Sequence, residues 1–88
     1  MNRNKNKSNR NRILLVEDDK TIALGLEYSL QQENYDVTIC NDAASAKAQI
    51  AEGDFQLALL DISLPDGNGF ELCKLLKEKE DIPVIFLT

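Results

Sequence analysis

The stretch that decides the fold is LLDISLPDGNG, which runs from Leu59 to Gly69. It completes an apolar run that begins at residue 57, places Asp61 directly after that run, and continues into a loop with one proline and two glycines. A carboxylate at the end of a buried strand is costly unless a partner compensates for its lost hydration. The next helical pattern begins near Gly69, too far along the chain for Asp61 to cap it. The stretch therefore predicts a buried strand whose terminal aspartate serves a site.

The rest of the chain alternates between short apolar runs and helical patterns. Continuous runs at 13–16, 57–60 and 84–87 predict strands covered on both faces, and the mixed run at 35–40 predicts a strand nearer an edge. Helical spacing of apolar residues covers about 20–33, 43–51 and 69–79. This βαβαβαβ order predicts the α/β class, with a doubly wound parallel sheet.

Local signals bound the helices and indicate which faces are buried. The candidate N-caps are Asp18 or Asp19 and Asn41 or Asp42, and the candidate residues after a helix end are Asn34 and Gly53. The stripes expected to face the core are Ile22, Ala23, Leu26 and Leu30; Ala43, Ala46 and Ile50; and Phe70, Cys73 and Leu76, with Leu72 and Leu75 beside them.

Charge is divided unevenly along the chain. The first twelve residues, MNRNKNKSNRNR, hold five of the ten Lys and Arg residues, which leaves five basic against fifteen acidic residues in 13–88. We expect residues 1–12 to be a disordered basic tail and residues 13–88 to form the domain. The acidic body disfavours direct binding of nucleic acid. No apolar run approaches the length of a membrane span or a secretory signal, so we expect no membrane partner.

The histidine and cysteine content restricts the chemistry. Cys40 and Cys73 lie far apart, as expected for reduced core residues of a cytoplasmic protein. Histidine is absent from the sequence, which excludes an imidazole base and the Ser-His and Cys-His nucleophile pairs. A metal site would have to consist largely of oxygen ligands, which favours a hard ion such as Mg²⁺. The chemistry that remains is that of carboxylates.

Carboxylates follow two of the predicted strands. Glu17, Asp18 and Asp19 follow the first strand, and Asp61 follows the third. Ligands of open α/β sheets bind at the carboxyl ends of the strands, so neighbouring first and third strands would crowd these acids at one edge. A helix cap with acids in its first turn also explains the 17–19 triplet taken alone. Acids on two strands favour a Mg²⁺ site, where a carboxylate could attack phosphorus.

Three segments together resemble the receiver (phosphoacceptor) domain of two-component response regulators. They are ILLVEDD, LLDISLPDGNGFEL and PVIFLT, and the resemblance extends from about Arg12 to Thr88. It implies a flavodoxin-like (CheY-like) doubly wound sheet of strand order 2-1-3-4-5 with five helices. The acid pair after the first strand is a weak motif alone, whereas its combination with D-x-x-L-P-D-x-x-G is highly specific.

The resemblance implies roles for the acidic residues. Asp61 would accept a phosphoryl group from a sensor histidine kinase, and Mg²⁺ would assist. Asp18 and Asp61 would bind the metal directly, with Glu17 nearby through water. Ser63 would offer its backbone carbonyl to the metal, and Asp19 would be a neighbour or a helix cap.

Further implied roles concern the loop and the output. Thr88 would be the hydroxyl residue that shifts toward the phosphoryl group, and Pro65 and Gly69 would shape the loop before the third helix. Such a domain is a cytoplasmic signalling switch and not an enzyme beyond its own phosphorylation and dephosphorylation. It would switch an output such as transcription, and would meet DNA only through an effector domain absent from this chain.

The family's fourth helix, fifth strand and fifth helix, with the phosphate-pairing lysine, have no counterpart in this sequence. We therefore expect 13–88 to be a partial receiver domain from a larger protein. The alternative is an interaction or dimerisation module that self-associates through the uncovered face near Ile22 and Leu26 and through the sheet edge. A Mg²⁺-dependent enzyme of the topoisomerase–primase kind is disfavoured, because it expects Asp-x-Asp where this chain has Asp61 and Ser63.

Overall fold

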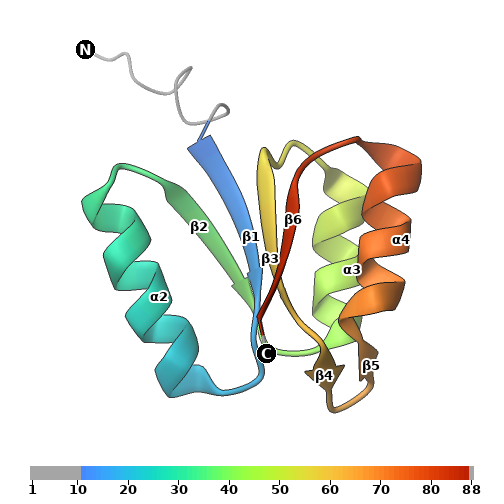
Figure 1. Cartoon of the computed structure of the whole chain (residues 1–88), viewed down its shortest axis with the longest axis horizontal. Coiled ribbons are helices and arrows are strands. Elements are labelled where there is room, and N and C mark those ends of the chain that lie inside the picture. The colour runs from blue at the N-terminus through green and yellow to red at the C-terminus, as the bar shows by residue number, and fades with distance from the viewer. Residues whose placement is uncertain (1–10, 88) are drawn as a thin grey trace.

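The computed structural model describes residues 11–87, which form a parallel sheet with helices on both faces (Figure 1). The sheet contains four strands in the order β2-β1-β3-β6. Its strands are β1 (Arg12–Val16), β2 (Asp36–Cys40), β3 (Leu57–Asp61) and β6 (Val84–Leu87), and the helices are α2 (Lys20–Gln32), α3 (Ala43–Glu52) and α4 (Gly69–Lys79). The predicted doubly wound α/β class and the flavodoxin-like order of its first four strands are confirmed.

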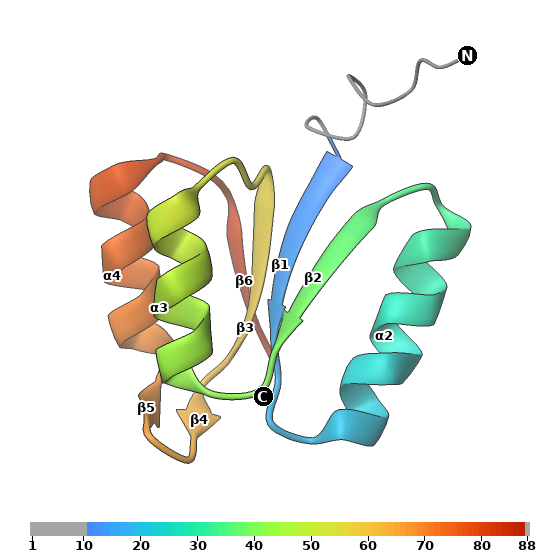
Figure 2. The same cartoon turned by 180° about the vertical axis from the view of Figure 1, so that it is seen from behind.

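The helices are divided between the two faces of the sheet. Helix α2 covers one face alone, while α3 and α4 lie side by side on the other (Figure 2). Strand β1 alternates between the two layers: Leu14 and Val16 pack toward α3 and α4, and Ile13 and Leu15 pack toward α2. All four side chains are buried, as expected for a central parallel strand covered on both faces.

The register of the sheet brings the carboxyl ends of its two central strands together. Val16 of β1 lies opposite Cys40 of β2 and Leu60 of β3. The residues that follow, Glu17 and Asp61, therefore leave neighbouring strands at the same edge. Edge strand β2 is less buried than β1 and β3, which confirms the prediction from its mixed sequence.

Short polar side chains begin the first two helices, as the sequence indicates. Asp19 caps α2 by accepting hydrogen bonds from the N–H groups of Thr21 and Ile22, and Asp42 caps α3 by accepting from the N–H of Ser45. After the helices, Asn34 has a φ of 70° and Gly53 a φ of 81°, the left-handed region expected there. The cap side chains of Asp19 and Asp42 thus accept from backbone N–H groups that have no partner within the helix at its start.

Three predicted core positions are wrong. Ile22 is 50% exposed, because α2 packs on the sheet through the other three residues of its predicted stripe, Ala23, Leu26 and Leu30. Phe70 is 58% exposed and Leu75 is 36% exposed, because α4 buries Leu72 and Leu76 instead. The Phe70 ring rests at the rim of the core against Phe86, with their centroids 5.0 Å apart. Self-association through the face near Ile22 and Leu26 stays a prediction: Ile22 is exposed, whereas Leu26 packs against the core.

Two boundaries also differ from the predictions. The segment predicted as a loop after β3 contains a small antiparallel hairpin of β4 (Ser63–Leu64) and β5 (Gly67–Asn68). Arg12, assigned to the tail, belongs to β1: its guanidinium lies 4.5 Å from the centroid of the Phe55 ring and donates to the carbonyl of Gly53. Residue 11 of the predicted tail is described, and residues 1–10 lie outside the described residues.

The two cysteines match the sequence analysis. Cys40 and Cys73 are both free thiols, one buried and one half-buried. Within residues 11–87, no helix has the length and apolar character needed to cross a membrane.

Leucines of α4 provide a matched test of this packing. Leu72→Ala removes a fully buried side chain and is expected to lower the free energy of unfolding by about 3 kcal/mol. Leu75→Ala makes the same change on a side chain that is 36% exposed and should cost under ~1 kcal/mol. Urea unfolding followed by circular dichroism measures both. Equal losses would contradict the orientation of α4.

Candidate functional site

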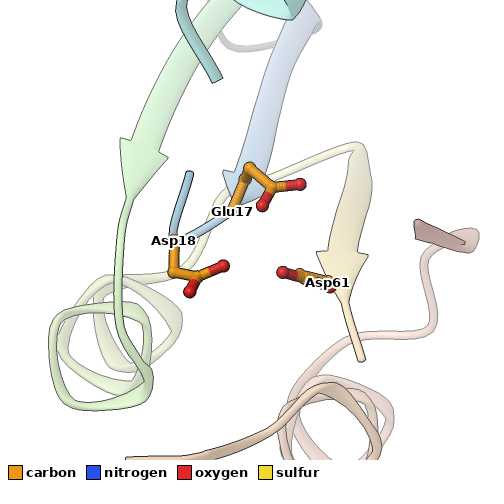
Figure 3. Close-up of side chains that lie close together, drawn as sticks. All are labelled: Glu17, Asp18 and Asp61. Atoms are coloured by element: carbon orange, nitrogen blue, oxygen red, sulfur yellow. The ribbon is translucent and has the colours of Figure 1, made fainter. Parts of the chain in front are cut away.

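Three carboxylates meet at the carboxyl ends of β1 and β3. Glu17 and Asp18 follow β1, Asp61 ends β3, and each offers a carboxylate oxygen within 4.8 Å of those of the other two (Figure 3). The parallel pairing of β1 with β3 produces this arrangement, because both strands end at the same edge. The crowding of acids predicted from the strand ends is confirmed.

The three carboxylates differ in their exposure. Glu17 is 7% exposed, Asp61 is half-buried and Asp18 is exposed. Burial raises the pKa of Glu17, and the nearby charges of Asp61 and Asp18 raise it further. A hydrogen bond from the N–H of Asp19 to Glu17 Oε2, 3.1 Å long, acts in the opposite direction on this pKa. The ionised cluster is therefore unfavourable by itself, and a cation beside it would relieve the repulsion.

The donor set suits a hard cation. All three ligand groups are carboxylates, and the sequence contains no histidine. Oxygen donors at a partly exposed edge suit Mg²⁺, which binds one or two carboxylates and keeps several of its waters. Zinc and copper prefer the nitrogen and sulfur ligands that this cluster lacks. The residues present therefore fit a magnesium ion, with room for water or an incoming anion on the side of Asp18.

The loop after Asp61 is held in place by a close backbone approach. The N–H of Gly69 donates to the carbonyl of Ile62 at 2.9 Å, which closes the segment that contains the β4–β5 hairpin. A Cβ atom on Gly69 would lie 2.3 Å from the carbonyl oxygen of Asp61, well inside van der Waals contact. Glycine is required here because α4 begins directly against the backbone of the central aspartate.

The other predicted site residues lie along this loop. Ser63 is the exposed first residue of β4, and Pro65 is in the exposed hairpin turn. Gly69 is the buried first residue of α4. Asp19 is a helix cap, as one reading of the sequence has it. Thr88 lies outside the described residues, so its predicted role stays a prediction.

The sequence analysis missed three polar contacts around the site. Asn68 caps α4 by accepting from the N–H of Glu71. Asp66 accepts from the N–H groups of the first turn of α3, and Asn41 donates to the carbonyl of Glu17. Asn68 could have been found by its position directly before a helical pattern. The other two contacts join distant segments and have no local signal.

Comparisons with known proteins agree with this geometry. The chain matches the model of the response regulator receiver domain over residues 13–88. It is similar to the response regulator ArlR of Staphylococcus saprophyticus, with 36% identity over 77 residues. That alignment covers 88% of this chain and 35% of the relative, so the chain spans about a third of that protein's length.

Solved structures show the same likeness. The non-phosphorylated HemR receiver domain from Leptospira biflexa has a TM-score of 0.82 and 42% identity, covering 88% of this chain and 63% of that one. The response regulator TrrA from Thermotoga maritima, solved in complex with Mg²⁺-BeF, has a TM-score of 0.80 and 33% identity. That match covers 88% of this chain and 68% of TrrA.

Two glycines test the close approach at Gly69. Gly69→Ala places a methyl group against the backbone of Asp61 and should lower the free energy of unfolding by about 1–3 kcal/mol. Gly25→Ala is the control: it lies inside α2, its added Cβ meets nothing within 4 Å, and it should stabilise the protein by ~1 kcal/mol. Chemical unfolding of both variants measures these changes in the free energy of unfolding. Destabilisation by Gly25→Ala, or none by Gly69→Ala, would contradict the geometry.

The raised pKa of Glu17 predicts a pH dependence with a definite sign. The folded state holds the Glu17 proton more tightly than the unfolded state does, so ionising this group lowers stability as the pH rises through its raised pKa. Glu17→Gln removes the charge and keeps an oxygen for the Asp19 N–H. In chelator, the variant should therefore gain stability over the wild type as the pH rises from 4.5 to 8. Thermal unfolding across that range measures the difference, and an advantage that instead grows toward acidic pH would refute it.

Proposed function

The chain belongs to the response regulator receiver domain family, and on that premise we propose that its Asp61 accepts a phosphoryl group from a sensor histidine kinase. The observation that carries the proposal is the gathering of three carboxylates within 4.8 Å of one another at the end of the central strands. Asp61 is the one that combines a fixed position at the end of β3 with partial access to solvent.

The transfer follows from the chemistry of the carboxylate. An Asp61 oxygen attacks the phosphorus of a phosphohistidine, the P–N bond breaks, and the imidazole leaves with its electron pair. The product is an acyl phosphate on Asp61, and no other residue of the site needs to form a covalent bond. The exposed side of the cluster, beside Asp18, gives the donor its approach.

Two anions must approach each other in this reaction, so charge has to be neutralised. We propose that Asp18, Asp61 and the backbone carbonyl of Ser63 hold Mg²⁺, with Glu17 acting through water. When bound, the ion offsets the repulsion between the cluster and the phosphoryl oxygens. The Mg²⁺-BeF complex of TrrA supports this choice of metal, since this chain is 33% identical to that protein.

The proposed output of phosphorylation is inferred from the family. This chain spans about a third of the length of the relative ArlR. We propose a cytoplasmic switch that controls transcription through an effector domain, with the sensor kinase as the direct partner of residues 13–88. We propose that Pro65 and Gly69 shape the loop that presents Asp61, and that Thr88 has the role of the hydroxyl residue that contacts the phosphoryl group.

Labelling with a small phosphodonor tests the assignment of Asp61. Incubation with acetyl phosphate and Mg²⁺ should add one phosphoryl group, seen by intact-mass spectrometry, and Asp61→Asn should abolish the addition. Asp18→Asn, or chelation of the metal, should slow labelling by about tenfold or more. Asp36→Asn is the matched control, because this exposed aspartate lies at the opposite end of the sheet. Undiminished labelling of Asp61→Asn would overturn the proposal.

A further inference from the structure

The 41–44 connection, which joins β2 to α3 and includes the first two residues of that helix, touches both parts of the carboxylate site. On one side, Asn41 Nδ2 donates to the carbonyl of Glu17 at 2.9 Å. The N–H of Glu17 in turn donates to the carbonyl of Cys40 at 3.0 Å. These bonds fix the backbone that carries Glu17 and Asp18 to the start of this connection.

On the other side, the same connection is bound by the loop that follows Asp61. Asp66 Oδ1 accepts from the N–H of Ala43 at 2.6 Å, and Asp66 Oδ2 accepts from the N–H of Ala44 at 3.0 Å. A Cβ atom placed on Gly67 would lie 3.1 Å from the Cβ of Ala43, so the hairpin turn also packs on this helix start. Both oxygens of one carboxylate are thus used to join segments 22 or 23 residues apart.

Helix α3 has its own cap and does not depend on Asp66 alone. Asp42 accepts from the N–H of Ser45, while Asp66 takes the N–H groups of Ala43 and Ala44. The helix start therefore divides its free N–H groups between one carboxylate of its own and one from the loop. Loss of the Asp66 contact would therefore affect the loop after Asp61 as well as the start of α3.

We infer that Asn41 and Asp66 are positioning residues, and that the 41–44 connection holds the Glu17–Asp18 pair and the Asp61–Gly69 loop at the spacing that metal binding needs. This inference rests on the proposed function, and it adds two residues to the site that touch neither the metal nor the phosphoryl group.

The loop is short enough for Asp66 to control the backbone beside Asp61. Its other end is closed by the bond from the Gly69 N–H to the Ile62 carbonyl. Ser63, whose carbonyl is a proposed metal ligand, lies between these two fixed points. Releasing Asp66 frees the turn of the hairpin and with it the direction of that carbonyl. Because Asp66 is exposed to solvent, the expected loss is several-fold and not complete.

A helix cap without a positioning role is the competing explanation, and Asp42 separates the two. Asp42→Ala removes a carboxylate from the same helix start, yet this side chain bonds within α3 and does not reach the loop. Asp66→Ala removes the contact that crosses to the loop. Asp66→Asn keeps one acceptor oxygen and should restore part of what the alanine variant loses.

The test measures Mg²⁺ affinity and amide exchange on the whole chain. Titration calorimetry with MgCl₂ should give a Kd raised about three- to tenfold by Asp66→Ala and by Asn41→Ala, and changed less than about twofold by Asp42→Ala. Hydrogen exchange without metal should lose protection at the Gly69 N–H in Asp66→Ala and keep it in Asp42→Ala.

The outcomes separate this inference from the proposed function. Equal Kd and exchange changes in Asp66→Ala and Asp42→Ala would overturn the positioning role while leaving phosphorylation of Asp61 intact. If the wild type binds no Mg²⁺, the metal part of the proposed function fails, and exchange at Gly69 still decides whether Asp66 holds the loop. Unchanged protection at Gly69 in Asp66→Ala would reject the inference in either case.

Discussion

The parallel pairing of β1 with β3 is the constraint on which the site depends. With Val16 opposite Leu60, the chain has to leave both strands at one edge, and each strand is followed or ended by a carboxylate. Repulsion among Glu17, Asp18 and Asp61 opposes this arrangement, and burial of Glu17 adds to its cost. The buried apolar side chains of β1 and β3 outweigh that cost, because moving the acids apart would expose the centre of the core.

The backbone around Asp61 follows from the same constraint. Helix α4 has to return over the sheet directly after the loop, and it begins so close to Asp61 that only glycine fits at its first residue. Between Asp61 and α4, the loop forms the β4–β5 hairpin. The turn of this hairpin contacts the start of α3. The proline, aspartate and glycine of that turn therefore reverse the chain and also help to hold the loop beside the acid cluster.

Sequence reasoning succeeds here where the signal is local. Continuous apolar runs located the strands, and Asp19, Asp42 and Gly53 bounded helices because capping depends on residues close in the chain. It failed for Phe70, since an apolar residue at the margin of a helical stripe can lie outside the buried face, and spacing alone does not fix how wide that face is. It could predict the acid cluster from strand ends but not the contacts of Asp66, whose partners are brought near only by the packed tertiary structure.

Hydrogen bonds join both parts of the acid cluster to the start of α3. Glu17 is tied through Asn41 to the start of α3, and the loop after Asp61 is tied through Asp66 to the same helix start. A cation at the cluster would lower the repulsion among the three carboxylates and so reduce the cost of holding the two segments at this spacing. Both segments are also hydrogen-bonded to residues 41–44 at the start of α3. The carboxylate cluster, the loop after Asp61 and this helix start therefore form one hydrogen-bonded unit.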